Sequence, residues 1–343
     1  MAASMKDVAR LAGVSIKTVS NVVNDYPFVS ADTRSRVRAA LDALDYRPNT
    51  SARGLRTGRT DLIALAIPAL DEPYFAEIAS LIVDAAERRG WMVLIDPTGG
   101  DRSREKLAAG GSRSSRIDGS IASPLALTGA DVAGLARQRP MVLLGERFAN
   151  AATDHVAVDS VRAAHEATRH LIDLGRQRIA FLGAHSRMRT AAGRLSGFRS
   201  ALAEAGRHVD QDLVVRASPF GRAEGAAAMA RLLSARKRPD AVFCVNDLLA
   251  MGAIRTLLSS GLRVPEDVAV VGFDDIEEAR FSTPSLTSIA PDKQQIAEMS
   301  VDLLCRRVRD GADGPPVDVV VGHRLQVRES TVGAAPLTSD PPG

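Results

Sequence analysis

Apolar residues recur at helical spacing in three short segments near the start of the chain. They are Val8, Leu11, Ala12, Val19, Val22, Val23, Val37, Ala40, Leu41 and Leu44. Ser4 and Ser30 are of the residue type that caps helix N-termini, and Gly13 interrupts the first pattern. The pattern predicts three short helices with a glycine-containing turn between the first two, which is typical of a helix-turn-helix. The alternative interpretation is a small helical cap whose charges are merely solvated.

From residue 61 onward, apolar runs alternate with helical patterns. The predicted strands are Leu62–Ile67, Val93–Ile95, Ser120–Ala122, Met141–Leu144, Ile179–Leu182, Ala241–Val245 and Val268–Phe273. The clearest helical stretches are Phe75–Arg89, Ala191–Ala205 and Leu248–Ser259. Such alternation indicates parallel sheets covered by helices on both faces, and about 270 residues favours two sheets with a ligand cleft between them. The segment 104–116 should be a helix, but Gly110 and Gly111 weaken it.

Charge is unevenly distributed along the chain. Residues 1–60 contain ten basic and five acidic residues, a net charge of +5, whereas residues 61–343 contain 34 basic and 36 acidic residues, a net charge of −2. All of the positive excess therefore lies in the predicted three-helix head. A polyanionic partner for the head alone is the simplest physical explanation.

Composition bounds the remaining possibilities. The chain has 343 residues, of which 45% are hydrophobic and 25% charged, so two or three globular domains are expected. We find no apolar run long enough to span a membrane and no signal-peptide core, and Cys244 and Cys305 make no disulfide framework. A cytoplasmic location without a membrane partner is expected.

Motifs of common enzyme classes are missing from the sequence. There is no G-x-S-x-G, because Gly193 to Gly197 has the wrong spacing, and there is no phosphate-binding G-x-x-x-x-G-K-[ST]. His165 and His170 are five residues apart, which does not match a helical zinc pair. We therefore expect no catalytic residues, no metal and no cofactor.

The head resembles that of the lactose/galactose repressor (LacI/GalR) family, and the resemblance covers about 330 residues. The matching residues are Asp7-Val8-Ala9, Ala12-Gly13-Val14-Ser15, Thr18-Val19-Ser20, Asn24, Val29-Ser30, Thr33-Arg34, Tyr46, Pro48-Asn49, Ala52-Arg53 and Leu55. The resemblance implies a small all-α helix-turn-helix DNA-binding head and an α/β two-lobed periplasmic-binding-protein-like (type I) core of parallel sheets. It also implies three passages of the chain between the lobes.

The expected domain boundaries follow from the pattern and the resemblance together. They are a head at 1–47, a hinge helix or linker at 48–60, an effector-binding and dimerisation core at 61–332 and a disordered tail at 333–343. Within the core, the N-lobe is expected at 61–159 and 291–321, and the C-lobe at 162–288 and 324–332. The Pro-rich tail contains no heptads, so we expect a homodimer rather than a tetramer held by a coiled coil.

The second predicted helix should enter the major groove of double-stranded operator DNA with Ile16, Lys17 and Thr18 leading. The family pattern extends the expected DNA contacts to a larger set: Ser15, Ile16, Lys17, Thr18, Ser20, Asn21, Asn24, Ser30, Thr33, Asn49, Ala52, Leu55 and Arg56. Asn21 stands where many relatives have a basic residue or a histidine, so the operator sequence is not transferable. Leu55 matches the family's minor-groove wedge; the alternative is an ordinary linker with one exposed leucine.

Several polar residues follow predicted strands at their carboxyl ends, where open α/β sheets bind ligands. The expected effector-binding residues are Tyr74, Phe75, Ser123, Asp159, Arg194, Phe220, Asn246 and Asp274. The resemblance implies that Arg194, Asn246 and Asp274 hold a small ligand, and this donor and acceptor set suits vicinal hydroxyls. The alternatives are structural: Asn246 caps the following helix, Arg194 forms a surface ion pair, and Phe75 belongs to the core.

These observations predict a dimeric transcriptional regulator, a repressor, that binds a pseudopalindromic operator and a small effector. The expected effector is a sugar or a sugar derivative. Three alternatives remain open at this point: a cytoplasmic sugar-binding protein without a DNA role, a regulator of the same family that responds to a purine or nucleoside, and a sugar-active enzyme with an appended head.

Overall fold

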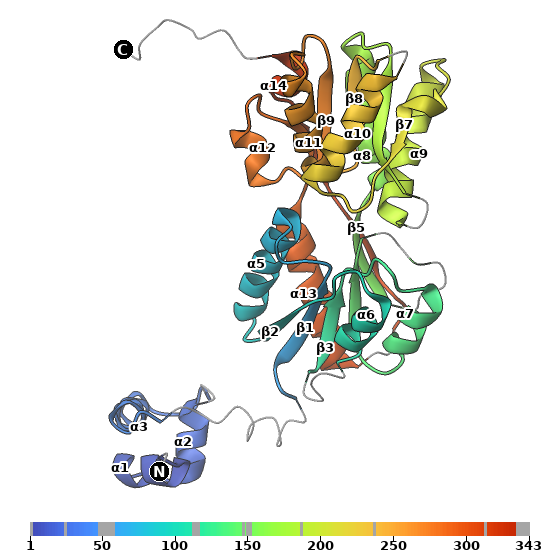
Figure 1. The fold of residues 1–343 in the computed structure, drawn as a ribbon. Helices are drawn as coiled ribbons and strands as arrows, with labels where there is room; N and C mark the ends of the chain where they lie inside the picture. Colours follow the sequence, from blue (N-terminus) through green and yellow to red (C-terminus); the bar gives the residue numbers. More distant parts are fainter. Residues whose placement is uncertain are drawn as a thin grey trace, which may run out of the picture. The chain divides into compact units, whose positions relative to one another are not determined.

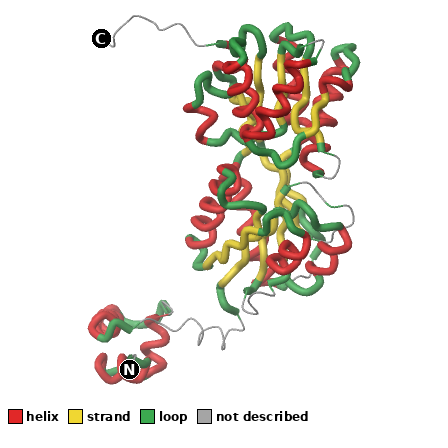
Figure 2. The backbone as a smooth tube through the Cα atoms, viewed as in Figure 1, coloured by secondary structure: helices red, strands yellow, loops and turns green. Residues whose placement is uncertain are grey.

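The computed structural model describes residues 3–23, 26–46, 59–111, 117–145, 148, 153–185, 188–235, 238–311 and 314–333 (Figure 1). The chain divides into two compact units, residues 1–60 and residues 61–343. The first is helical and the second is a mixed α/β unit of two lobes (Figure 2). This confirms the predicted fold class of a small all-α head with an α/β core.

The head consists of helices α1 (Met5–Ala12), α2 (Ile16–Val23) and α3 (Ala31–Ala43). The backbone N–H of Ser4 donates to the Asp7 carboxylate at 3.0 Å, and the Thr33 N–H donates to the Ser30 hydroxyl at 3.3 Å. These bonds satisfy N–H groups that a helix start leaves open. Gly13 ends α1 at a φ of +64°, which a residue without a Cβ adopts at little cost. The buried side chains form one small core of Val8, Ala9, Ala12, Val19, Val22, Val37 and Ala40, against which Val23, Leu41 and Leu44 pack. Leu11, which the helical spacing grouped with these apolar positions, is instead 57% exposed.

The second unit contains two six-stranded sheets. The sheet of the N-lobe has the order β11-β5-β4-β3-β1-β2, and its strands are β1 (Leu62–Ile67), β2 (Met92–Pro97), β3 (Gly119–Ala122), β4 (Met141–Leu144), β5 (Asp154–Val158) and β11 (Asp318–Val321). The sheet of the C-lobe has the order β12-β10-β9-β8-β6-β7, and its strands are β6 (Ile179–Ala184), β7 (Val214–Arg216), β8 (Ala241–Cys244), β9 (Ala269–Phe273), β10 (Thr287–Pro291) and β12 (His323–Gln326).

Helices cover both sheets (Figure 1). Those of the N-lobe are α5 (Pro73–Glu87), α6 (Arg102–Ala109), α7 (Gly129–Ala136) and α13 (Lys293–Asp310). Those of the C-lobe are α8 (Ser160–Asp173), α9 (Arg189–Glu204), the 3₁₀ turn η1 (Gln211–Leu213), α10 (Arg222–Ser234), α11 (Asp247–Ser259), α12 (Glu277–Phe281) and α14 (Glu329–Val332). Along β1, Ile63, Leu65 and Ile67 pack with α5 and α13, whereas Ala66 packs with α6 and α7. Alternate residues of one strand thus serve two cores, as a doubly covered sheet requires.

Glycines bring the helices of the C-lobe into backbone contact. A Cβ on Gly197 of α9 would lie 2.0 Å from the carbonyl oxygen of Val161 in α8. A Cβ on Gly252 of α11 would lie 2.0 Å from the carbonyl oxygen of Arg222 at the start of α10. Helices α8 and α9, and helices α10 and α11, therefore pack as two close pairs that only a residue without a side chain permits.

The chain passes between the lobes three times, and a single residue lies between the flanking elements at each passage. Asp159 joins β5 to α8, Asp292 joins β10 to α13, and Gly322 joins β11 to β12. Asp159 has φ −69° and ψ 86°, and Asp292 has nearly the same values of −74° and 81°. Both aspartates also cap the helix that follows, through bonds to Arg162 N and Gln295 N at 2.9 Å.

Two local features differ from the sequence-based expectation. Strand β12 is antiparallel to β10, whereas every other neighbouring pair of strands is parallel. Because β10 ends at the second passage and β12 begins at the third, the two strands must run in opposite directions. Helix α6 forms despite its thin apolar face, since its buried Glu105 accepts backbone N–H bonds from residues 125–127. It ends at Ala109, before Gly111 with a φ of +68°, and residues 112–116 lie outside the described residues.

Candidate functional site

The second helix of the head presents a polar face. Val19 and Val22 of α2 are buried, whereas Ser15, Ile16 and Lys17 are exposed at its N-terminal end. Asn21 follows Lys17 by four residues and lies half-buried, so the two side chains share one face of the helix.

The other predicted DNA contacts of the head differ in their exposure. The Thr18 backbone N–H donates to the Ser15 hydroxyl at 3.1 Å, which fixes the start of α2. Ser20 and Thr33 are half-buried, and Ser30 is exposed where it caps α3. The predicted contacts Asn24, Asn49, Ala52, Leu55 and Arg56 lie outside the described residues, as does most of the expected hinge.

In the core, Arg194 and Asp274 form a buried pair. The Arg194 guanidinium lies 3.5 Å from the Asp274 carboxylate, and both side chains are 11% exposed. The same guanidinium lies 3.4 Å above the centre of the Phe273 ring and donates to the carbonyl oxygen of Val245. Arg194 is therefore held from three sides, so it is not the surface ion pair that the alternative interpretation expected.

Asp274 has an uncommon backbone conformation. Its φ is +108°, and the next residue, Asp275, has a φ of +46°. Positive φ is costly for a residue with a side chain and persists only where the surroundings enforce it. Here the Asp274 N–H donates to Ile289 O at 2.8 Å, which carries the hydrogen bonding of β9 and β10 one residue into the turn.

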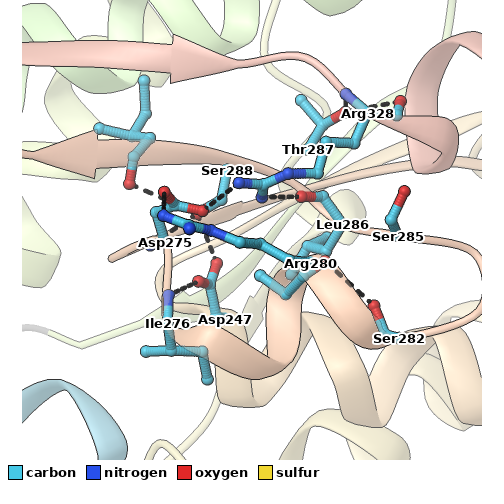
Figure 3. Close-up of polar contacts among 12 residues, drawn as sticks. Asp247, Asp275, Ile276, Arg280, Ser282, Ser285, Leu286, Thr287, Ser288 and Arg328 are labelled. Atoms are coloured by element: carbon cyan, nitrogen blue, oxygen red, sulfur yellow. Dashed lines mark hydrogen bonds and ion pairs between the residues drawn. The ribbon is translucent and has the colours of Figure 1, made fainter.

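The turn is fixed by a buried polar network (Figure 3). The Arg328 guanidinium donates to the Asp275 carboxylate at 2.5 Å and to Leu286 O at 2.7 Å, and Arg280 approaches the same carboxylate at 3.6 Å. Asp247 accepts from Ser288 Oγ at 2.6 Å and from the N–H of Ile276 at 3.0 Å. Burial and the charge of Asp274 raise the pKa of Asp247 well above its usual range.

The N-lobe contributes an aromatic side chain to the same region. Tyr74, near the start of α5, packs against the apolar cores of both lobes. Burial raises the pKa of its hydroxyl, and the Asp274 carboxylate raises it further. Phe75 lies against Tyr74 with a ring separation of 5.3 Å and packs on the N-lobe core. The charges of Arg194 and Asp274 thus act on Tyr74 across the lobe boundary, while Phe75 packs against it.

A second group lies at the ends of β6 and β8. The Asn246 side-chain amide donates to Phe220 O at 3.0 Å, and its oxygen accepts from Leu249 N at 3.0 Å. Asn246 is therefore a helix cap, and it also fixes the loop that carries Phe220. The Phe220 ring lies edge-on to His185 at 6.2 Å.

The two remaining predicted effector residues, Ser123 and Asp159, make other contacts. Ser123 is half-buried after β3, and its N–H donates to Ala66 O at 2.9 Å, so it stands at the carboxyl edge of the N-lobe sheet. Asp159 is exposed, and its carboxylate caps α8 at the first passage between the lobes. The structure does not join it to the Arg194–Asp274 pair.

The described residues contain no group of three or more His, Cys, Asp or Glu side chains that could hold a metal ion. None of the helices in the described part of the chain combines the length and hydropathy that crossing a bilayer requires.

Comparison with known proteins gives a consistent result. Residues 4–49 match the model "Bacterial regulatory proteins, lacI family", and residues 168–331 match "Periplasmic binding protein-like domain". The HTH-type transcriptional repressor PurR of Photobacterium profundum is 32% identical over 90% of this chain and 92% of its own. The chain belongs to the lacI family of bacterial regulatory proteins.

Solved structures of lacI-family proteins show the same fold. The lac repressor dimer bound to operator and the anti-inducer ONPF is 28% identical, with a TM-score of 0.84 over 97% of this chain and all of that chain. The complex of the transcriptional regulator CelR with cellobiose is 33% identical, with a TM-score of 0.71 over 96% of this chain and 99% of that chain. The resemblance that was expected over about 330 residues is therefore confirmed, since the match to the lac repressor covers 97% of this chain.

Sequence reasoning missed two acidic residues of α5 in this lacI-family protein. Glu72 stands at the N-cap position without a side-chain cap bond, and burial and the charge of Asp274 raise its pKa. Glu77 pairs with Lys293, the first residue of α13. Glu72 could have been noticed, because glutamate is unusual at a helix N-cap, where Ser, Thr, Asp and Asn are the common residues. Glu77 and Lys293 are 216 residues apart, and no local pattern connects them.

The pKa of Asp274 gives a testable consequence for stability. It is about 6, against an ordinary 3.8, because burial raises it more than Arg194 and Lys293 lower it. An acid whose pKa rises on folding destabilises the fold increasingly as pH rises from the unfolded to the folded pKa. At pH 8, replacing the ionised Asp274 by asparagine should raise the unfolding free energy by up to about 3 kcal/mol relative to wild type. The loss of the counter-charge of Arg194 reduces this gain. At pH 4 this gain should nearly vanish. Urea titrations at both pH values measure the difference, and a gain that does not depend on pH would contradict the assignment.

Proposed function

We propose that this chain is a dimeric repressor that binds a pseudopalindromic operator and changes its operator affinity when a neutral sugar binds between the lobes. The observation that carries the proposal is the Arg194–Asp274 pair of the C-lobe, with Tyr74 of the N-lobe packed on the C-lobe core, in a chain whose head has an exposed helix-turn-helix face. A ligand held by residues of both lobes has a different affinity for each lobe arrangement, which is the requirement for control.

The DNA-binding part rests on shape and charge. The head carries a net charge of +5, whereas the rest of the chain carries −2, so the attraction to phosphate resides in the head. Lys17 and Asn21 face away from the head's core, and these residue types recognise guanine and adenine edges in the major groove. The solved lac repressor relative is a dimer on operator DNA. A two-fold dimer with one such helix per chain reads two half-sites about one helical turn apart.

The effector chemistry follows from the groups near Asp274. A guanidinium donates and a carboxylate accepts, whereas a sugar hydroxyl does both, so vicinal hydroxyls match the Arg194–Asp274 pair. The half-buried carboxyl of Glu72 interacts with Asp274 and adds a second acid. An anionic ligand would be repelled here, whereas a neutral polyol would not. Tyr74 and Phe220 supply the apolar faces on which sugar rings pack.

A thermal-shift panel tests the ligand class on the full chain. Cellobiose and other neutral sugars should raise the melting temperature, because a ligand that binds only the folded state stabilises it. Sugar phosphates should not raise it. Stabilisation by a purine or nucleoside would instead support the second candidate, a purine-responsive regulator. This candidate is included because repressors named PurR are 32% and 34% identical to this chain. A neutral sugar that binds should be recovered unchanged after long incubation, since we propose regulation and not catalysis.

Base-reading residues make a separate prediction for the head. Lys17→Ala and Asn21→Ala should each weaken binding to the selected operator by about 1–3 kcal/mol, while binding to random DNA changes little. Lys6→Ala, an exposed charge on α1, serves as the control and should affect operator and random DNA alike. Fluorescence anisotropy with both DNAs at one salt concentration measures the difference. Equal losses of operator and random DNA binding in the Lys17 and Asn21 variants would remove them as base readers.

A further inference from the structure

The strongest unassigned feature of the core is a buried lysine that connects the two lobes. Lys293 is the first residue of α13, directly after the second passage, and its side chain is 8% exposed. Its ammonium donates to the Glu77 carboxylate of α5 and to the carbonyl oxygen of Asp275 at 3.0 Å. Helices α5 and α13 belong to the N-lobe, whereas Asp275 follows β9 of the C-lobe.

The acceptor in the C-lobe is a strained turn. Asp274 and Asp275 both have positive φ, and such a conformation needs support from its surroundings. The Asp275 side chain is held by Arg328 and Arg280, and its N–H donates to Ser288 Oγ at 3.1 Å, all within the C-lobe (Figure 3). The ammonium of Lys293 bonds to the same turn from an N-lobe helix.

We propose that Lys293 is a positioning residue for the effector site, and that it holds the Asp274–Asp275 turn in register with α5 through Glu77. This inference rests on the proposed function, because it takes Asp274 as an effector-binding residue. The helix α5 that carries Glu77 also carries Tyr74, which packs against the apolar core of the C-lobe. One ammonium thus sets the position of the carboxylate in one lobe relative to the aromatic wall of the other.

The geometry also gives the direction of the coupling. When the lobes move apart, Lys293 stays with α13 and α5, and its bond to the Asp275 carbonyl is lost. The turn then has only its C-lobe partners, so its strained backbone becomes free to relax and Asp274 leaves its place. Separation of the lobes and loss of the effector-binding geometry are therefore a single event.

The decisive measurement uses hydrogen exchange of the full chain without ligand. In Lys293→Met, the amides of residues 274–276 should exchange about tenfold faster or more, since the lost bond involves a charged donor. Glu77→Gln should give a smaller increase, because Lys293 keeps its bond to Asp275. Lys293→Arg keeps a positively charged donor and should restore the protection of these amides. If Lys293→Met acted only through changed packing, arginine would not restore it.

Glu298 supplies the matched control. It lies on α13 and pairs with Arg88 and Arg89, which directly follow α5, so Glu298→Gln removes an ion pair between α13 and the end of α5 without touching the turn. In Glu298→Gln, the amides of residues 274–276 should exchange at the same rate as in wild type. If Lys293→Met leaves these amides as protected as in wild type, or if Glu298→Gln exposes them equally, the proposal is wrong.

A second experiment separates this inference from the proposed function. Cellobiose is titrated calorimetrically into wild type and into the Lys293 and Glu298 variants. Weaker binding to Lys293→Met alone, with recovery in Lys293→Arg, supports both proposals. If wild type binds no cellobiose, the sugar assignment loses support, whereas the exchange result still decides the role of Lys293.

Discussion

Replacing Arg194 with alanine is expected to abolish the response to effector while leaving operator binding within about twofold of wild type. The guanidinium stacks on Phe273, bonds Val245 O and pairs with Asp274, so its removal takes the donor from the site and leaves a buried carboxylate unpaired. A lost hydrogen bond to a charged group costs about 1.5–3 kcal/mol, which corresponds to roughly a 10- to 150-fold loss of effector affinity. Asp274→Asn should have a similar effect.

Two further variants sharpen this test. Arg194→Lys keeps the charge but loses the planar stack and the forked donor geometry, so effector affinity should remain well below wild type. Arg162→Ala removes an exposed arginine of the same lobe that pairs with Glu166, and it should behave as wild type. Calorimetry with the sugar found in the thermal-shift panel, together with operator anisotropy, measures both properties. Wild-type effector affinity in the Arg194 variant would place the ligand elsewhere.

The glycine contacts of the C-lobe predict the largest effect on stability. Gly252→Val and Gly197→Val each place a side chain where a backbone carbonyl lies 2.0 Å from the new Cβ, so the paired helices must separate. We expect each variant to lose about 3 kcal/mol or more of unfolding free energy, because overpacking against backbone is poorly relieved. Gly134→Ala on α7 is the matched control. Its Cβ would meet nothing within 4 Å, so it should stabilise by about 0.5–1 kcal/mol.

Calorimetric unfolding of the three variants checks this prediction. A small loss in Gly252→Val, comparable to an ordinary surface substitution, would mean that α10 and α11 are able to slide apart. Loss of stability in the α7 control would show that glycine substitution is costly in this chain for some reason other than helix contact.

Features that depend on neighbouring residues were predictable from the sequence. The apolar run Leu62–Ile67 became β1 with the same bounds, since a strand covered on both faces needs apolar residues at every position. Glycine is a common signal of a helix end, and Gly175, Gly206 and Gly261, which follow α8, α9 and α11, have φ values of +81°, +69° and +75°. The helix caps Ser4 and Ser30 were recognised in the same way.

Features that depend on distant residues were not predictable. Glu105 lies within a polar stretch, and nothing in that stretch reveals that it is buried against the N–H groups of residues 125–127. The Glu77–Lys293 pair and the direction of β12 follow from where the chain passes between the lobes. The roles of Arg194 and Asp274 were inferred from family resemblance, because each alone has an ordinary structural explanation.

The one-residue passages have a mechanical consequence. At Asp159 and Asp292, the residue that bends between the lobes is also the residue whose carboxylate caps the next helix. A rotation about these backbone bonds therefore strains the cap, and the strength of the cap sets the torsional stiffness of the joint. Gly322 has no side chain that could cap a helix, but its carbonyl accepts from the Asp292 N–H at 2.9 Å and its N–H donates to the Gln295 side chain at 3.3 Å. Hydrogen bonds therefore resist bending at all three passages, and at two of them they are bonds that the start of a helix needs anyway.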